Sequence, residues 1–213
     1  MKFENTSPIF DYKALRLIVG IIALALPIIV TLASQEDLAS ISASYFTGAR
    51  DYFVGLLFVV GALMLAYNGH TSKEALASKV AAVSAVVVAL FPTLSDGCTS
   101  SQSSAIHAAA AVTLFLILAY FCFGPFRENT KGKAGKKGYR AKLYFTCGTV
   151  MVVCLLVGFV SKLVLSCETM DAWKVIYWVE AVSLGAFGVA WIVAGKIIPA
   201  LVDKQDALIL FRR

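Results

Sequence analysis

The sequence predicts an all-α polytopic membrane protein with six transmembrane helices and with both termini in the cytoplasm. The first observation behind this prediction is composition. Of 213 residues, 59% are hydrophobic and only 15% are charged, whereas about a quarter of the residues in soluble domains are charged. The second observation is a series of six long apolar runs, and the third is the way lysine and arginine are distributed between the connections.

Each of the six apolar runs predicts one helix: residues 14–33, 52–67, 76–94, 105–123, 143–165 and 173–198. A helix needs about 17–25 residues to cross the hydrocarbon core, so the second run is slightly short. Backbone polar groups in lipid must be satisfied within their own segment, which leaves a helix as the structure for such runs. The first run ends in a sequence like a signal-peptide cleavage site, but we expect it to be retained.

The connections between the runs are too short to hold a separate soluble domain, so residues 1–213 are expected to form a single membrane domain. Residues 199–213 follow the last run and alternate leucine and isoleucine with charges. We expect them to form a cytoplasmic tail that either lies along the membrane interface or docks a partner.

Selected residues of three runs share one face of their helix at helical spacing. They are Gly55, Val59, Ala62 and Ala66 in the second run, Cys147, Met151, Cys154, Gly158, Ser161 and Lys162 in the fifth, and Glu180, Ser183, Leu184, Phe187 and Trp191 in the sixth. The face of the fifth run is small and weakly polar and is expected to contact protein rather than lipid, and the small residues of the second run permit close packing. Trp173, Tyr177 and Trp178 are expected in an aromatic belt at the outer boundary, and Trp191 near the inner one.

All but three of the 19 lysines and arginines lie in the terminal segments or in connections that fall on the same side. The three exceptions are Arg50, Lys162 and Lys174. Cytoplasmic connections carry the excess of basic residues, so both termini are expected in the cytoplasm. The expected location is the inner (plasma) membrane of a bacterium.

The connection from residue 127 to residue 142 carries the densest cluster of basic residues. Its sequence RENTKGKAGKKGYR lacks a series of aromatic side chains on which bases could stack, and its glycines predict flexibility. We therefore expect a solvated loop beside anionic headgroups, with membrane lipids rather than nucleic acid as partners. A lipid-sensing role for this loop is the alternative.

The five cysteines divide into two groups. Cys122, Cys147 and Cys154 fall within the helical runs and are expected to pack as small apolar residues. Cys98 and Cys167 fall in two outer connections, where the compartment is oxidising. We therefore predict a Cys98–Cys167 disulfide, with two unpaired thiols as the alternative.

The ionisable residues within or beside the runs gather toward the outer side: Arg50, Asp51, Asp96, His107, Lys162 and Glu180. Such residues are costly in a membrane and are candidates for function. Together with Tyr45 and Thr47, they are expected to line a polar pocket that opens to the outer leaflet. Glu180 is the deepest, about 10 Å from the start of its run, and Lys162 is expected to reach toward it.

The alternative is that these charges are structural. Asp51 suits the positive end of a helix dipole, and Arg50 and Lys162 could extend to headgroups. This interpretation is harder to sustain for Glu180 because of its depth.

Three functional hypotheses follow. The first is the binding of a lipid headgroup or small polar ligand by Tyr45, Thr47, Arg50, Asp51, Lys162 and Glu180. The second is a metal-independent lipid hydrolase or transferase, with His107 as general base and Asp96 or Asp51 orienting it. The third is an ion or proton channel or transporter with Glu180 in the path. The two histidines fall on opposite sides, so no zinc site and no cofactor is expected.

The stretch SISASYFTGARDYFVG, residues 40–55, is followed by VVVALFPT at residues 86–93. Together they resemble a signature of bacterial six-helix integral membrane proteins. The resemblance covers roughly the second and third runs. It implies six helices and a functional role for Tyr45, Arg50 and Asp51, and it carries no activity.

Overall fold

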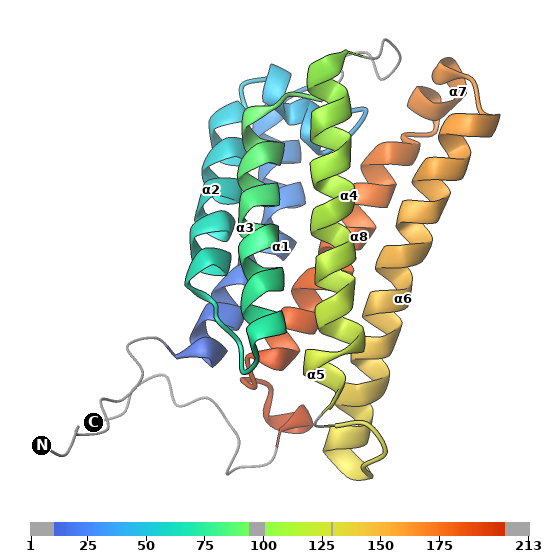
Figure 1. Ribbon diagram of the computed structural model, residues 1–213. Coiled ribbons are helices and arrows are strands. Elements are labelled where there is room, and N and C mark those ends of the chain that lie inside the picture. Colours follow the sequence, from blue (N-terminus) through green and yellow to red (C-terminus); the bar gives the residue numbers. More distant parts are fainter. Residues whose placement is uncertain (1–10, 94–100, 129, 203–213) are drawn as a thin grey trace, which may run out of the picture.

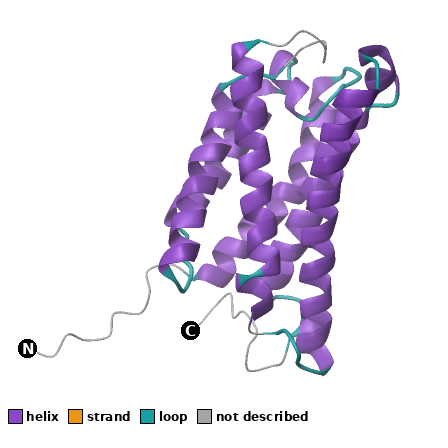
Figure 2. Ribbon diagram, turned by 45° about the vertical axis from the view of Figure 1, so that its right-hand side comes forward, coloured by secondary structure: helices purple, strands orange, loops and turns teal. Residues whose placement is uncertain are grey.

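The structure of the protein, a computed structural model, describes residues 11–93, 101–128 and 130–202. Within these residues every regular element is a helix (Figures 1 and 2). Six helices are long: α1 (Tyr12–Ser34), α2 (Arg50–Ala66), α3 (Ser72–Leu90), α4 (Gln102–Phe123), α6 (Gly135–Val164) and α8 (Val175–Ala194). Four are short: η1 (Ser42–Phe46), α5 (Pro125–Glu128), α7 (Cys167–Ala172) and η2 (Pro199–Leu201).

The six long helices form a closed ring in chain order. Each packs against the next, and α8 packs against both α6 and α1, which closes the ring. Successive long helices run in opposite directions, so the bundle has two distinct ends (Figure 1). We call the end that carries η1 and α7 the η1 end. The opposite end carries α5, η2 and the first turn of α1, and we call it the α5 end.

Side-chain caps explain where several helices begin. Asp11 accepts a hydrogen bond from the backbone of Lys13 at the start of α1, and Thr71 accepts one from the backbone of Glu74 at the start of α3. Ser101 forms a reciprocal capping box at the start of α4. These caps satisfy backbone donors that would otherwise lack a partner. They start α3 and α4 a few residues before the apolar runs do.

The basic connection is more structured than its glycines predict. Gly135 begins α6, so the last part of residues 127–142 is helical rather than a flexible loop. Side chains in the first turns of α6 also form hydrogen bonds with residues 199–202, which follow α8. Lys136 donates from Nζ to the carbonyls of Pro199 and Val202, at 2.8 and 3.0 Å, and Arg140 donates to the carbonyl of Leu201 at 3.2 Å. These tertiary contacts outweigh the intrinsic flexibility of the segment.

Four helical segments are long and apolar enough to cross a membrane: Tyr12–Ser34, Gln102–Glu128, Gly135–Val164 and Val175–Ala194. Two of the six expected spans are not among them. Helix α2 has only 17 residues, and α3 carries Lys73, Glu74 and Lys79 in its first turns. The prediction of an all-helical protein is confirmed for the described residues, and these four segments are consistent with a membrane protein by length and composition.

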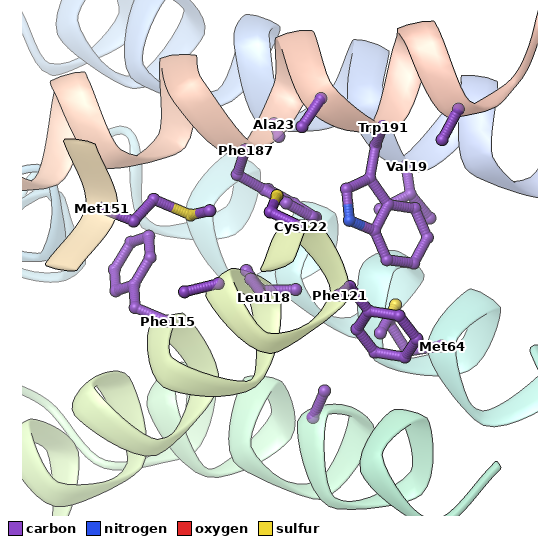
Figure 3. Close-up of a cluster of buried hydrophobic side chains, with 14 of the residues drawn as sticks. Val19, Ala23, Met64, Phe115, Leu118, Phe121, Cys122, Met151, Phe187 and Trp191 are labelled. Atoms are coloured by element: carbon purple, nitrogen blue, oxygen red, sulfur yellow. The ribbon is translucent and has the colours of Figure 1, made fainter. Parts of the chain in front are cut away.

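The interior of the bundle holds two apolar clusters. The cluster nearer the α5 end is rich in aromatic rings and is centred on Trp191, which is fully buried (Figure 3). Phe121, Phe126, Phe187 and Tyr67 all have ring centroids within 5.3 to 5.7 Å of it. The expectation that Trp191 sits in an interfacial belt is therefore wrong, because its ring fills the core between helices.

The second apolar cluster lies toward the η1 end. Its buried side chains include Phe53, Leu57, Val30 and Ile41. Helices α1 and α8 approach closely at two glycines, Gly20 and Gly188. A Cβ atom built on Gly188 would lie 2.8 Å from the carbonyl oxygen of Gly20. Small residues permit such close approach between helices.

Candidate functional site at the η1 end

The segment from residue 35 to residue 49, which contains η1, covers the η1 end of the bundle, and we call it the cap. Three polar contacts fasten the cap and the end of α1 to α8. Lys174 and Asp37 form an ion pair, and the backbone N–H of Tyr177 donates to the carbonyl of Ala39 at 3.2 Å. The hydroxyl oxygens of Thr31 and Tyr177 lie 3.0 Å apart. The cap is thus held on α8 at several points.

Glu180 makes the fourth and deepest of these contacts. Its carboxylate accepts two hydrogen bonds from Ser42, one from the backbone N–H at 3.1 Å and one from the hydroxyl at 2.7 Å. Glu180 is half-buried, and Ser42 is buried at the start of η1. Because a carboxylate has about four acceptor positions, roughly two remain available for another donor.

A small cavity lies directly under this contact. Its volume is about 40 Å³, enough for a few water molecules. Glu180 and Ser42 supply the polar part of the wall, and the other lining residues are apolar: Leu26, Ile41, Phe53, Leu57, Val88, Ala111, Leu114, Phe115 and Leu184. The cavity therefore combines one acidic group with an otherwise apolar surface.

His107 lies on α4 close enough to Glu180 for the two groups to interact electrostatically. It is buried, with 4% of its surface exposed. Its Nδ1 lies 2.7 Å from the carbonyl oxygen of Phe91. A carbonyl only accepts, so Nδ1 carries the proton and donates it. Within the described residues Nε2 is buried and has no hydrogen-bond partner, so it is able to accept a hydrogen bond from water or a ligand.

Tyr45 and Arg50 form a separate pair at the surface. The Arg50 guanidinium stacks 4.4 Å from the centre of the Tyr45 ring and donates to the Tyr45 hydroxyl at 2.9 Å. Thr47 organises the turn before α2, since its Oγ1 donates to the carbonyl of Ser44 and accepts from the backbone of Ala49. Asp51 is exposed in the first turn of α2, as its proposed dipole role requires.

The expected ligand-binding residues are therefore not brought together in one pocket. The cavity beside Glu180 has none of Tyr45, Thr47, Arg50, Asp51 or Lys162 in its wall. Lys162 is exposed near the end of α6, and Ser42, rather than Lys162, is the hydrogen-bond partner of Glu180.

Asp96 and Cys98 lie outside the described residues, so the roles expected of them stay predictions. Cys167 lies at the start of α7, and Cys122, Cys147 and Cys154 are free thiols.

The catalytic hypothesis requires a nucleophile beside His107, the proposed base. Among the described residues no hydroxyl or thiol forms a hydrogen bond with Nε2 of His107. The hydroxyl of Ser103 donates to the carbonyl of Pro92, and that of Ser104 closes the capping box of α4. Neither contacts Nε2 of His107. No group of three or more histidine, cysteine or acidic side chains in the described segments is arranged to hold a metal ion.

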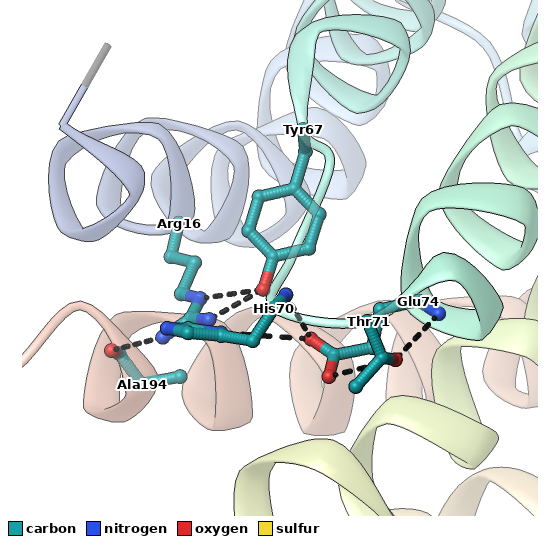
Figure 4. A network of polar contacts seen from close by, with 6 residues as sticks. All are labelled: Arg16, Tyr67, His70, Thr71, Glu74 and Ala194. Carbon is teal, nitrogen blue, oxygen red and sulfur yellow. Dashed lines mark hydrogen bonds and ion pairs between the residues drawn. The ribbon is translucent and has the colours of Figure 1, made fainter. Parts of the chain in front are cut away.

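A second polar network, at the α5 end, was not anticipated from the sequence (Figure 4). Arg16 donates to the Tyr67 hydroxyl from Nε at 3.1 Å and from Nη2, and to the carbonyl of Ala194 at 3.4 Å. Beside it, Glu74 accepts from the backbone of His70 and from Thr71. The signal was present, because an arginine inside an apolar run needs a partner.

No protein-family model, curated protein or solved structure matches this chain. The resemblance through residues 40–55 and 86–93 therefore stays a prediction.

Proposed function

We propose that the chain is an integral membrane protein with six spans, in which α2 and α3 cross the membrane with the four more apolar segments. Helix α2 is about 25 Å long at 1.5 Å per residue, close to the thickness of the hydrocarbon core. The charges of α3 lie in its first turns, and the rest of the helix is apolar. Both helices also leave large apolar side chains exposed, among them Phe58, Leu65 and Val83, which suits contact with lipid.

In this proposal the α5 end faces the cytoplasm and the η1 end faces the outside of a bacterial inner membrane. The distribution of basic residues supports it. Arg50, Lys162 and Lys174 belong to the η1 end, whereas all other basic residues belong to the terminal segments or to connections at the α5 end. An excess of lysine and arginine marks the cytoplasmic side.

The orientation predicts that Cys98 and Cys167 are joined, because the compartment at the η1 end is oxidising. Cys122, Cys147 and Cys154 are free thiols, so none of these three is a competing partner in this proposal. Non-reducing peptide mass spectrometry of protein purified from membranes should recover a peptide with these two residues linked. Recovery of both as free thiols, under alkylation that also labels Cys154, would refute the pairing.

We propose further that the cavity under the cap binds a small polar group with Glu180 as its acceptor. Glu180 interacts electrostatically with His107, but within the described residues it has no lysine or arginine partner, and a charge in the membrane requires compensation. A small cation meets this need and donates hydrogen bonds to the remaining acceptor positions. The ligand we propose is a primary ammonium group, supplied either by a small amine or by an aminophospholipid headgroup.

The size of the cavity restricts this ligand. An apolar cavity of about 150 Å³ holds benzene, so a volume of about 40 Å³ suits a group of two or three non-hydrogen atoms. Methylammonium fits this limit, and tetramethylammonium does not. The apolar wall favours an ammonium that carries a short carbon chain over a fully hydrated metal cation.

The test is thermal unfolding in a neutral detergent with methylammonium, tetramethylammonium or dioctanoyl phosphatidylethanolamine added. Methylammonium should raise the Tm of the parent protein by about 2–4 °C, or about 1 kcal/mol for a chain of this size. The Glu180→Gln variant should lose this rise, and Glu168→Gln, which changes an exposed glutamate in α7 at the same end, should keep it. Equal rises in the two variants, or a response to tetramethylammonium, would refute the proposal.

The aromatic cluster around Trp191 bears on the transport hypothesis. Its buried rings pack on the α5 side of the cavity, which supports binding rather than transport. The buried Nε2 of His107 supports the catalytic hypothesis only if a substrate brings its own nucleophile or water. Ligand binding is therefore the function that the geometry supports best.

A further inference from the structure

A larger depression lies at the α5 end, on the opposite side of the aromatic cluster from the cavity under the cap. Its volume is about 620 Å³, within the range of about 300–1,000 Å³ that is typical of ligand sites. We call it the α3–α5 groove. Its walls come from the start of α3, the end of α4 and the α5 corner: Thr71, Ser72, Lys73, Glu74, Tyr120, Phe123, Gly124, Pro125, Arg127, Glu128 and Lys131.

Three basic side chains line this groove: Lys73, Arg127 and Lys131. Within the described residues none of the three makes a side-chain hydrogen bond or ion pair with the protein. Two acidic residues share the groove. Glu74 is already occupied, because it is buried and accepts from the backbone of His70 and from Thr71. Glu128 is exposed. The groove thus presents three available cations and one available carboxylate.

Arg127 is the most informative of the three. Its guanidinium lies over the Phe145 ring, 4.7 Å from the ring centre. Its Nε is buried and has no hydrogen-bond partner in the described part of the chain. A guanidinium offers five donors in a rigid fork that matches the geometry of carboxylate and phosphate. Leaving these donors unused is costly for a half-buried group, unless a ligand completes them.

The start of α3 contributes a second source of positive potential. Helix α3 has 19 residues, and its N-terminal residues Ser72 and Lys73 line the groove. The side chain of Thr71 accepts a hydrogen bond from the backbone N–H of Glu74. The backbone N–H groups of Ser72 and Lys73 donate to no acceptor in the described structure. Backbone donors and the helix dipole at such a position favour an anion.

We propose that the α3–α5 groove binds a phosphate group, with Arg127 as the bidentate donor and with Lys73 and Lys131 as further cations. Tyr120 and Phe123 form the apolar side of the groove and are partly exposed, as aromatic residues are at the level of lipid headgroups. Basic pockets on the cytoplasmic side of a membrane bind anionic headgroups. The phosphate is carried either by an anionic phospholipid or by a small phosphorylated solute that reaches the groove from the cytoplasm.

The experiment compares two double variants of the full chain with the same change in charge. Lys73→Gln/Lys131→Gln removes two cations of the groove. Lys133→Gln/Lys142→Gln removes two exposed cations that lie near the same end and outside the groove wall. All four lysines are exposed, so both proteins should fold. Arg127→Gln is added as a third variant, with its Tm measured first because stacking on Phe145 contributes to stability.

Native mass spectrometry in a neutral detergent gives the affinity for dioctanoyl phosphatidylglycerol, with dioctanoylglycerol as the lipid that lacks phosphate. The groove double variant should bind phosphatidylglycerol at least about tenfold more weakly than the parent, and the control double variant within about threefold. Dioctanoylglycerol should bind all of them equally. Equal losses in the two double variants would overturn the proposal, since they would indicate only a general surface charge effect.

A second arm identifies the source of the phosphate. Inorganic phosphate replaces chloride at constant ionic strength, and Tm is the readout. A rise in the parent that the groove double variant lacks, without selective binding of phosphatidylglycerol, assigns the groove to a soluble phosphorylated ligand. Selective binding of phosphatidylglycerol without a response to phosphate assigns it to lipid. A groove that responds to neither probe would refute phosphate recognition.

Discussion

Replacing Gly188 with leucine is expected to cost about 3 kcal/mol or more and to lower Tm by about 6–12 °C. The reason is the contact between α1 and α8. A Cβ atom at residue 188 would lie 2.7 Å from Cγ of Leu24 and 2.8 Å from the carbonyl oxygen of Gly20. The Leu24 side chain can shift, but the carbonyl belongs to the α1 backbone. The two helices would have to separate, and the packing that closes the ring would be lost.

Gly185 provides the matched control for this variant. It lies on the same helix three residues earlier, and a Cβ atom there would meet nothing within 4 Å. Gly185→Leu should therefore leave Tm unchanged or raise it slightly, because glycine is a poor helix former compared with leucine. Thermal unfolding of both variants in detergent, followed by size-exclusion chromatography, is the measurement. Similar losses in the two variants would show that helix composition, rather than helix contact, governs the effect.

Replacing Arg16 with methionine is expected to have the second large effect, a loss of about 2–3 kcal/mol. Arg16 donates hydrogen bonds to Tyr67 and to the carbonyl of Ala194, and its guanidinium also lies 5.2 Å from the Tyr67 ring and 5.0 Å from the Phe126 ring. Methionine keeps most of the apolar stem and none of these interactions. The Tyr67 hydroxyl would then be left without its donor at the edge of the aromatic cluster.

Arg50 makes a smaller set of contacts of the same kind at an exposed position. It stacks on Tyr45 and donates to its hydroxyl, but it is exposed. Exposed pairs of this kind contribute about 0.5–1 kcal/mol, so Arg50→Met should cost no more than about 1 kcal/mol. Urea or thermal unfolding of both variants compares one type of interaction at two depths. A loss for Arg50→Met that equals the loss for Arg16→Met would contradict the role assigned to burial.

The sequence predicts the buried faces of the later helices well. The buried residues of α6 include Cys147, Met151, Gly158 and Ser161, and those of α8 include Ser183, Phe187 and Trp191, as helical spacing indicates. Lys162, which was assigned to the same face of α6, is exposed. Small and weakly polar residues form a recognisable stripe on these helices because the rest of each surface is large and aliphatic.

The same reasoning fails for α2. Gly55 was expected to pack closely, but it has nothing within 4 Å of its Cβ position, and the buried residues of α2 include Phe53, Leu57 and Met64. Helical spacing shows which residues share a face, but it does not show which face turns inward when both are apolar. Here the larger side chains fill the interior and the glycine lies outside.

The partners of the charged residues were the least predictable part of the site. Glu180 was expected near Lys162, its neighbour across a short connection, and it binds Ser42 instead. These two residues are 138 positions apart, and only the closed ring of helices brings them together. Their pairing depends on how the ring closes, which is a property of the whole chain.

Ring closure has a consequence for how the protein is made. The ribosome completes α8 last of the long helices, and domains generally form from the N-terminus during synthesis. The contact of Gly20 on α1 with Gly188, and that of Ser42 in η1 with Glu180, therefore form only when translation is almost finished. A nascent chain that stops before α8 leaves one side of α1 without its packing partner, so the ring of helices can close only after α8 has been made.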